Sequence, residues 1–292
     1  MDGEHPPHRD ASRNGRRVLV TGSTSGVGLA TAEALSGAGC QVIVHGPDAE
    51  RVDAAAAGIR SRVPTADVEG VAADLSSQAA VRQMATTIEN RYGTLDVLVN
   101  NAAAVFDHWS INGDGVELTF AVNYVAVYLL TRLLLPTIGR SDDGRIVTVA
   151  SEAHRGATLD FDDLQTVNEY ERFKAYGRSK LADLLFTYEL SRRVKPEEIV
   201  VAAMHPRTVR TTLFRPRNPV ERIVMAILKL KAHSPQQGAD TAVWLATSDE
   251  AHALHGSYVA NRQAIESSAE SQDPETAAHL WNATAKITGL EP

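Results

Sequence analysis

Short apolar runs alternate with segments of helical periodicity along this chain, and this alternation restricts the possible folds more than any other feature. Longer segments with apolar residues three and four positions apart separate the runs, for example 49–62 and 116–138. Buried strands that alternate with helices form a parallel sheet covered on both faces. We therefore predict a single doubly wound α/β domain with a parallel seven-stranded sheet flanked by helices. The predicted strands are residues 18–20, 41–45, 68–73, 95–99, 145–150, 199–204 and 257–260.

A glycine-rich turn follows the first of these runs. Thr21-Gly22-Ser-Thr-Ser-Gly26-Val-Gly28 separates the strand at 18–20 from a helical pattern at 29–35. Glycines at such a turn let the backbone approach a pyrophosphate, and the unpaired N–H groups of the helix N-terminus attract its negative charge. A merely flexible turn is the alternative, but the order strand, turn, helix favours a dinucleotide site. This arrangement is typical of a Rossmann-type domain.

Tyr176 and Lys180 lie four residues apart in a segment with helical apolar spacing, which places them on one face of a helix. An ammonium beside a phenol stabilises the phenolate, so that the tyrosine becomes a usable proton donor or acceptor near neutral pH. The alternative is a solvated lysine beside a half-buried tyrosine. Tyr170 and Lys174 have the same spacing, so the spacing by itself does not select the first pair.

Polar residues follow the apolar runs where those runs end. Asp74 follows the third run, Asn100-Asn101-Ala102 the fourth, Ser151 the fifth and His205-Pro206 the sixth. Open parallel sheets bind ligands at the C-terminal ends of their strands, so we expect these residues to meet at one edge. The alternative is local: Ser151 ends a strand and Asp74 stabilises a turn. Ser76 is the predicted N-cap of the helix after the third run.

Composition and charge argue against several classes of protein. The chain has 292 residues, a net charge of -7 and a pI near 5.8, which does not suggest a nucleic-acid partner. The single cysteine, Cys40, excludes an intrachain disulfide and fits a reducing compartment. The polar N-terminus lacks the apolar core of a signal peptide, and no run of about 18 apolar residues predicts a membrane span. We expect a cytoplasmic protein with a disordered tail at 1–14, one domain at 15–292 and a substrate lid at about 207–235.

Taken together, these residues resemble the short-chain dehydrogenase/reductases of the compact kind over nearly the whole chain after residue 15. The end of the chain and the sequence Tyr176-Gly-Arg-Ser-Lys180-Leu-Ala182 are similar to the retinol-dehydrogenase-like branch, which includes bacterial members. Tyr170 does not fit that pattern, so the resemblance selects Tyr176. The matching motifs are Thr21-Gly22-x-x-x-Gly26-x-Gly28, Asp74, Asn100-Asn101-Ala102, Asn123, Ser151, Tyr176-x-x-x-Lys180 and Pro206.

The resemblance implies a role for each matching residue. Tyr176 would be the general acid in carbonyl reduction or the base in alcohol oxidation, and Lys180 would stabilise its phenolate and bind the nicotinamide ribose. Ser151 would hydrogen-bond the substrate oxygen, and Asn123 would hold a water that links Lys180 to solvent. The expected cofactor contacts, besides Tyr176 and Lys180, are Gly22, Ser23, Ser25, Gly26, Val27, Gly28, His45, Asp74, Leu75, Asn101, Ala102, Pro206, Val209 and Thr211.

The type of nicotinamide cofactor depends on the end of the second strand. An acid there favours NAD, because it accepts hydrogen bonds from the ribose 2′-OH. His45 stands at this position, and Arg51 is placed to reach a 2′-phosphate from the next helix. The sequence therefore favours NADP, with NAD as the alternative. Two departures from the family pattern lie near the cofactor, because Ala103 and Arg207 stand where glycines are usual.

The resulting prediction is an NAD(P)-dependent oxidoreductase that interconverts an alcohol and a carbonyl on a lipophilic or natural-product small molecule. Phe106, Trp109 and Phe214 are the apolar candidates for its substrate pocket. The alternative is a catalytically silent cofactor-sensing or interaction protein with the same fold. No metal is implied, and His154 is expected at the substrate entrance. The resemblance also implies a homo-oligomer, dimer or tetramer, that pairs through the helices carrying Asn123 and Tyr176.

Overall fold

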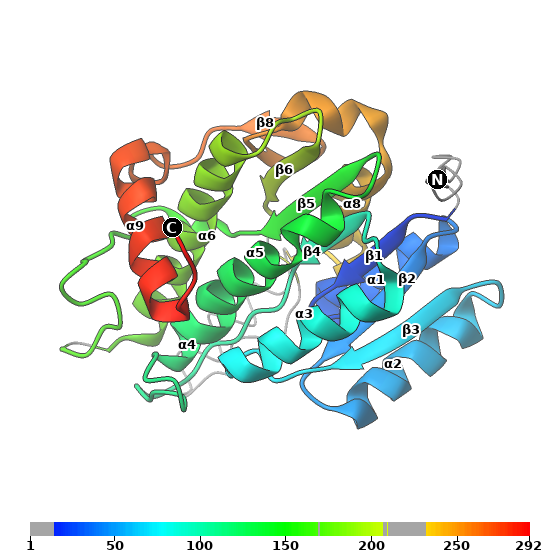
Figure 1. Ribbon diagram of the computed structural model, residues 1–292, viewed down its shortest axis with the longest axis horizontal. Coiled ribbons are helices and arrows are strands. Elements are labelled where there is room, and N and C mark those ends of the chain that lie inside the picture. Colours follow the sequence, from blue (N-terminus) through cyan, green and yellow to red (C-terminus); the bar gives the residue numbers. More distant parts are fainter. Residues whose placement is uncertain (1–14, 169, 207–208, 210–231) are drawn as a thin grey trace, which may run out of the picture.

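A single sheet of eight strands forms the centre of the molecule (Figure 1). The computed structural model describes residues 15–168, 170–206, 209 and 232–292. Along the sheet the strands follow the order β3-β2-β1-β4-β5-β6-β7-β8, and β1 to β7 pair in parallel, as the sequence predicted. The strands are β1 (Arg17–Val20), β2 (Gln41–Gly46), β3 (Asp67–Ala72), β4 (Val97–Asn100), β5 (Gly144–Val149), β6 (Ile199–Met204), β7 (Ser257–Ala260) and β8 (Gln263–Ile265).

The eighth strand is an addition that the sequence analysis did not predict. It lies antiparallel to β7, and the two strands are joined by Asn261 and Arg262. The φ angles of these two residues are 53° and 63°, in the left-handed region that a tight hairpin turn requires. Such turns usually contain glycine, so the absence of glycine here hides the hairpin in the sequence.

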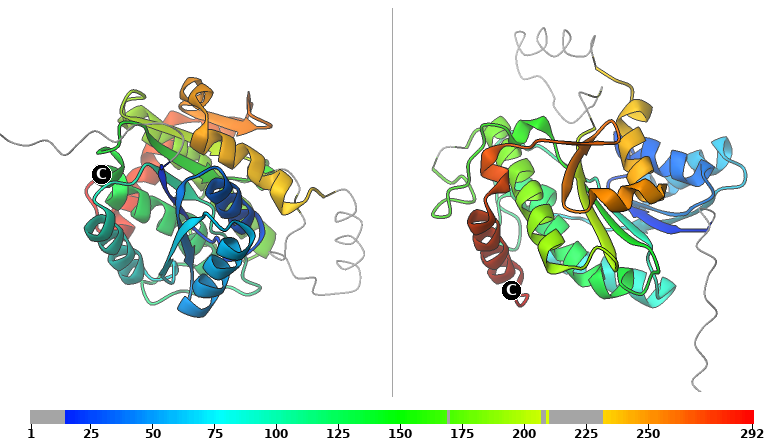
Figure 2. Two further views of the ribbon diagram at one scale, coloured as in Figure 1. Left: turned by 90° about the vertical axis from the view of Figure 1, so that its right-hand side faces the viewer. Right: turned by 90° about the horizontal axis from the view of Figure 1, so that it is seen from above.

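Helices cover both faces of the sheet (Figure 2). Successive strand residues point to opposite faces, so Val18 and Val20 belong to one apolar core and Leu19 to the other. The first core lies under α1 (Gly26–Gly37), α2 (Ala49–Arg62) and α8 (Pro235–Thr247). The second lies under α3 (Gln78–Tyr92), α5 (Ala126–Ile138), α6 (Arg172–Arg193) and α9 (Pro274–Thr288).

The neighbours of β1 determine where a ligand can enter. β1 lies between β2 and β4, so the order of the strands reverses on its two sides. At such a switch point the connections leave toward opposite faces and open a crevice at the C-terminal ends of the strands. The predicted polar residues follow β1, β3, β4, β5 and β6, which all end at this edge of the sheet.

The helix boundaries differ from the prediction in two places. The helix expected at 116–138 consists of α4 (Leu118–Phe120), a π-helical turn at Ala121–Val125 and α5. Ser77 rather than Ser76 caps α3, because its hydroxyl accepts a hydrogen bond from the Ala80 N–H at 3.3 Å. The run Leu118–Ile138 is long and apolar enough to cross a membrane by length and composition, but 72% of its most apolar stretch is buried inside the fold.

Helix α9 packs against α6 (Figure 1). The sequence analysis expected α6, the helix that carries Tyr176, to form part of a subunit interface. Trp281 of α9 stacks on Phe186 of α6, with ring centroids 5.8 Å apart and an interplanar angle of 14°. The guanidinium of Arg193 lies 4.3 Å from the centre of the Trp281 ring. The chain therefore covers part of this helix with its own C-terminal segment. Short 3₁₀ turns at Asp249–Leu254 and Ala269–Gln272 lead into β7 and α9.

Replacing Trp281 by alanine should lower the free energy of unfolding by about 3–5 kcal/mol, because it leaves a large cavity between α9 and α6. Trp281 is 3% exposed, whereas Trp109 is 39% exposed. Trp109→Ala is therefore the matched control and should cost less than about 1 kcal/mol. Chemical denaturation of both variants tests this packing. Equal effects at the two positions would contradict it.

Candidate active site

The glycine-rich turn after β1 packs directly against the loop after β4. Gly22 has a φ of +63°, and a side-chain carbon there would lie 2.7 Å from the Cα of Ala102. A side chain at Gly28 would collide with the amide group of Asn101 and with the Gly22 carbonyl. Glycine is thus required at both positions for steric reasons. The merely flexible turn considered as an alternative does not fit this close contact.

Thr21 connects the same two segments through hydrogen bonds. Its hydroxyl accepts from the Asn101 N–H at 2.9 Å and from the Ala102 N–H at 3.0 Å. The side-chain amide of Asn101 donates back to the Thr21 carbonyl at 2.8 Å. Thr21 was part of the sequence motif but not among the predicted site residues, because a threonine at the end of a strand has no distinctive pattern.

The N-terminus of α1 has the properties of an anion site. Its N-cap, Ser25, makes no side-chain capping bond, and the first turn contains no acidic residue. Ser25 and Gly26 are exposed, whereas Ser23 is buried and donates to the Val20 carbonyl at 2.7 Å. The first N–H groups of a helix lack intrahelical partners and carry a partial positive charge. This end of α1 therefore fits a pyrophosphate group.

His45 lies beneath the turn and not at its surface. It is 2% exposed, and its Nδ1 accepts a hydrogen bond from the Gly22 N–H at 3.0 Å. Its Nε2 lies 3.1 Å from the Ala73 carbonyl, so Nε2 carries the proton in this arrangement. Burial lowers the pKa of His45 from 6.5 to about 4, because the charged ring would lose its hydration. The neutral imidazole thus joins β3 to the glycine-rich turn.

Residues at the rim of the crevice are more exposed. Asp74 is exposed, and one of its carboxylate oxygens accepts from the Ser76 N–H at 2.9 Å, whereas the neighbouring Leu75 is buried. Asp48 caps α2 by accepting from the Arg51 N–H, and its carboxylate also lies 3.3 Å from Nε of Arg51. The Arg51 side chain is 68% exposed in the first turn of α2, which follows β2.

The predicted pair lies on α6 with the expected spacing. Tyr176 is 9% exposed, and Nζ of Lys180 lies 5.8 Å from the centre of its ring. Lys180 is itself buried and donates to the Val149 carbonyl at 2.9 Å and to Asp183 at 2.8 Å. Tyr170 precedes the helix, and its hydroxyl donates to the Phe106 carbonyl at 2.7 Å. Tyr170, the alternative tyrosine with the same spacing to a lysine, therefore uses its hydroxyl to bind the loop after β4.

Gly177 lets α6 lie close to the turn that follows Ser151. A side-chain carbon at Gly177 would lie 2.7 Å from the carbonyl oxygen of Ala153, so α6 contacts this turn closely. Ser151 caps the 3₁₀ turn Glu152–His154, and its hydroxyl accepts from the Ala153 N–H at 3.2 Å. Sequence reasoning overlooked Gly177, although a glycine inside an otherwise regular helix is a signal of close packing.

His154 is not at a substrate entrance, so that expectation was wrong. The side chain is fully buried. Its Nε2 accepts from the Ser268 N–H at 3.1 Å, which leaves Nδ1 to donate to the Ser151 carbonyl at 2.6 Å. Burial is the main reason that the pKa of His154 is lowered. The neutral ring fixes the backbone of Ser151 to the C-terminal segment.

Asn123 connects the loop after β4 to α6. It is buried in the π-helical turn, and its Nδ2 donates to the Ala104 carbonyl and to the Ser179 hydroxyl, both at 3.0 Å. Its Oδ1 accepts from the Ala104 N–H at 2.7 Å. Ser179 in turn donates to the Tyr176 carbonyl at 2.8 Å. Such π-helical turns occur often at functional sites, and this one directs Asn123 toward Ser179 of α6.

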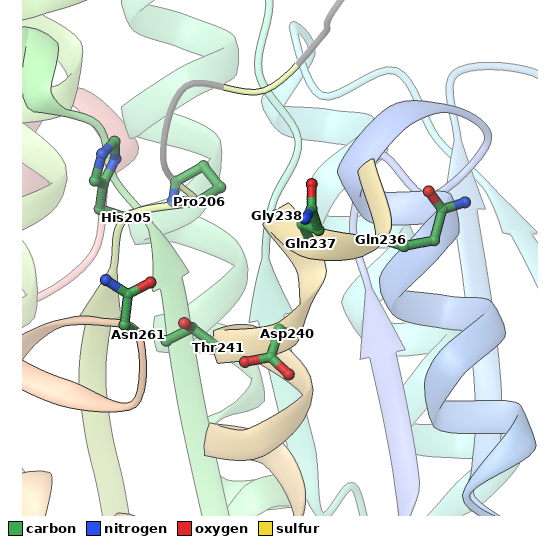
Figure 3. Close-up of a pocket in the computed structure, with 8 residues that line it drawn as sticks. All are labelled: His205, Pro206, Gln236, Gln237, Gly238, Asp240, Thr241 and Asn261. Atoms are coloured by element: carbon green, nitrogen blue, oxygen red, sulfur yellow. The ribbon is translucent and has the colours of Figure 1, made fainter. Parts of the chain in front are cut away.

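The remaining predicted cofactor contacts that the structure describes, Pro206 and Val209, lie between the end of β6 and the start of α8. A side chain at Gly238 would contact both Val209 and Val27, which places these two valines beside each other at the N-terminus of α1. Next to them is a cavity of about 390 Å³ formed by the end of β6, the first turns of α8 and the β7–β8 turn (Figure 3). Thr211 and Arg207, like most of the predicted lid at 207–235, lie outside the described residues. The cavity is lined by His205, Pro206, Gln236, Gln237, Gly238, Asp240, Thr241 and Asn261.

Comparison with known proteins gives consistent matches. A model of the short chain dehydrogenase family matches residues 16–222. Retinol dehydrogenase 13 of Mus musculus is 35% identical over 94% of this chain and 84% of its own length. A crystal structure of an uncharacterized protein from Mycobacterium paratuberculosis is 30% identical, with a TM-score of 0.78 and 96% of each chain covered. The Pseudomonas aeruginosa RhlG/NADP active-site complex is 25% identical, with a TM-score of 0.66 over 85% of this chain and 95% of that chain.

Protonation of His45 should destabilise the fold as the pH falls. With a pKa of about 4 folded and 6.5 unfolded, the unfolded chain takes up the proton first, so stability is lost between these values. Between pH 7 and pH 5 the wild type should lose about 2 kcal/mol more unfolding free energy than His45→Gln. His108 is exposed, so His108→Gln is the control and should behave as the wild type. Identical pH dependence in wild type and His45→Gln would contradict the assignment.

Proposed function

This chain belongs to the short-chain dehydrogenase/reductase family of oxidoreductases, and on that premise we propose that it interconverts an alcohol and a carbonyl compound with Tyr176 as the proton donor or acceptor. The contact between α6 and the turn after β5 supports this proposal most directly. Gly177, next to Tyr176 in the chain, lies against Ala153 of the turn that Ser151 caps. Nζ of Lys180 lies 5.8 Å from the centre of the Tyr176 ring. A proton donor, a hydroxyl for the substrate oxygen and a cation thus come from adjacent elements.

Each of these residues has a distinct task in the proposed reaction. The Lys180 ammonium stabilises the Tyr176 phenolate, because opposite charges at short distance in a buried site attract strongly. The Ser151 hydroxyl donates a hydrogen bond to the substrate oxygen as negative charge develops on it. Asn123 and Ser179 hold the helix in register with the loop after β4. Tyr176 then gives its proton to that oxygen in reduction, or removes it in oxidation.

The nicotinamide cofactor is proposed to bind at the C-terminal edge of the sheet, over the turn after β1 and the loop after β4. Gly22 and Gly28 let the turn lie directly against this loop, and the uncapped end of α1 at Gly26 is open, with nothing within 4 Å of a side-chain carbon there. Gly26 and Val27 begin this helix, so their N–H groups are placed to hold the pyrophosphate. When bound, the cofactor supplies or accepts the hydride, which none of the twenty side chains can do.

NADP is the form that we propose. The residue at the end of β2 is His45 and not an acid, and its imidazole ring is buried under the glycine-rich turn. The nearest acid, Asp48, is engaged as the N-cap of α2. Arg51 is largely exposed at the same end of the sheet, where it can reach a 2′-phosphate.

The proposed substrates are lipophilic. Four large apolar side chains, each 39% to 59% exposed, belong to the loop after β4 and the segment before and at the start of α6. The two segments are joined by the bond from Trp109 Nε1 to the Gln165 carbonyl and by the ion pair between Arg172 and Asp107. Exposed apolar side chains on two joined segments suit an apolar ligand. These side chains are Trp109, Ile111, Val167 and Phe173.

Replacing Tyr176 by phenylalanine should lower turnover about 10²–10⁴-fold and leave the dissociation constant of the cofactor nearly unchanged, because only the ionisable hydroxyl is removed. Tyr170→Phe is the matched control, since it removes a hydroxyl that serves a loop contact. Oxidation of reduced cofactor on a panel of lipophilic ketones gives the rates. Full activity in Tyr176→Phe would rule out the proposed proton donor, and cofactor binding without turnover by the wild type would favour a sensor.

Replacing Arg51 by alanine should weaken NADPH binding about tenfold and leave NADH binding unchanged, because a charge-assisted bond to the 2′-phosphate is lost. Arg62 is on the same helix and pairs with Glu33, so Arg62→Ala is the control. Fluorescence titration of each variant with both cofactors measures the two constants. Equal weakening for both cofactors, or none for NADPH, would show that Arg51 does not select the phosphate.

A further inference from the structure

A buried carboxylate lies next to the lysine of the candidate site. Asp183 is one turn beyond Lys180 on α6 and is 1% exposed. Its Oδ2 accepts a hydrogen bond from Nζ of Lys180 at 2.8 Å. Its Oδ1 has no hydrogen-bond partner among the described residues. An acid this deeply buried and half satisfied is costly, and among the described residues Lys180 is the cation that compensates its charge.

The same lysine faces Tyr176. The ammonium is held between two acceptors, the Val149 carbonyl and Asp183, and its nitrogen lies 5.8 Å from the centre of the Tyr176 ring. Among the described residues, the other titratable groups that interact with the pair are Tyr176 and Tyr124. Tyr124 lies in the π-helical turn, and its hydroxyl is hydrogen-bonded to Thr284 of α9. In the part of the chain that the structure describes, no second cation compensates the charge of Asp183.

We propose that Asp183 is a positioning residue that limits how strongly Lys180 favours the Tyr176 phenolate. The inference rests on the proposed function, because it concerns the proton that Tyr176 transfers. A carboxylate 2.8 Å from the ammonium cancels part of the positive charge felt at the phenol. The same bond holds Nζ toward the end of β5. Asp183 thus fixes both the place and the net charge of the group that acts on Tyr176.

The compensation depends on pH. Burial raises the pKa of Asp183 to about 6, even though the attraction of Lys180 acts in the opposite direction. Above this value the carboxylate is charged and offsets the ammonium. As the pH falls through it, Asp183 becomes neutral and the full charge of Lys180 acts on the tyrosine. A purely structural aspartate would hold Lys180 in place without linking its own titration to that of Tyr176.

Asp183→Asn separates the two roles, because the amide oxygen can still accept from Lys180 but carries no charge. The Tyr176 ring, followed by NMR of ¹³C-labelled tyrosine and assigned with Tyr176→Phe, should ionise about one pH unit lower than in the wild type. At a pH below the midpoint of the Tyr176 ionisation, alcohol oxidation by Asp183→Asn should be about tenfold faster than by the wild type at the same pH. An unchanged ring titration in the folded variant would overturn the proposal.

Glu189→Gln is the matched control. Glu189 is on the same helix, is also buried, and pairs with Arg192 and Arg193 away from the lysine. Its neutralisation changes the net charge of the protein by the same amount and should leave both the ring titration and the rate profile unaltered. A shift of the same size in this variant would mean that general charge, and not the Asp183–Lys180 contact, acts on Tyr176.

A second measurement applies if Asp183→Asn does not fold. In the wild type, the ¹³C signal of Tyr176 should show an additional inflection near pH 6, where Asp183 gains its proton. A signal without this inflection would contradict the coupling. Both NMR readouts are independent of turnover. A protein that shows the coupling but reduces no ketone would therefore refute the proposed function and leave the role of Asp183 intact.

Discussion

The close approach of two backbone segments determines the rest of this site. The turn after β1 and the loop after β4 touch at Gly22 and Ala102, and Thr21 binds them together through two backbone N–H groups. They leave neighbouring strands at the point where the sheet order reverses. A side chain at Gly22 or Gly28 would push the segments apart and displace the end of α1. The contact between the two segments, and with it the position of the N-terminus of α1, therefore depends on the absence of two side chains.

Charge is arranged on the two sides of the proposed cofactor site in different ways. The end of α1 offers N–H groups without a capping side chain or an acid in its first turn, so an incoming phosphate can supply the negative charge. On the other side, Lys180 is buried and already has Asp183 as its counter-charge. His45 and His154 are both kept neutral by burial, and backbone partners on both ring nitrogens hold each ring in place. They fix the turn and the Ser151 backbone without adding charge to the site.

Much of this arrangement could be predicted from the sequence, because apolar periodicity and glycine spacing report directly on strands and tight turns. The seven parallel strands, the turn at Gly22 and the placement of Tyr176 on a helix follow from such local patterns. β8, the burial of His45 and the covering of α6 by Trp281 depend on contacts between residues far apart in the chain. A single sequence does not show which side of a strand end a histidine faces. Asp183 looked like any polar residue on an amphipathic helix until its neighbours were known.

The transfer of hydride is tested most directly by following an isotope. Purified protein is given NADPH deuterated at C4 of the nicotinamide, as each stereoisomer in turn, together with a lipophilic ketone that it consumes. Mass spectrometry of the alcohol should find deuterium on the carbinol carbon with one stereoisomer and not with the other. The Tyr176→Phe variant should form almost none of this product. Oxidation of the cofactor without deuterium in the alcohol, or no alcohol from any ketone, would contradict an alcohol–carbonyl oxidoreductase.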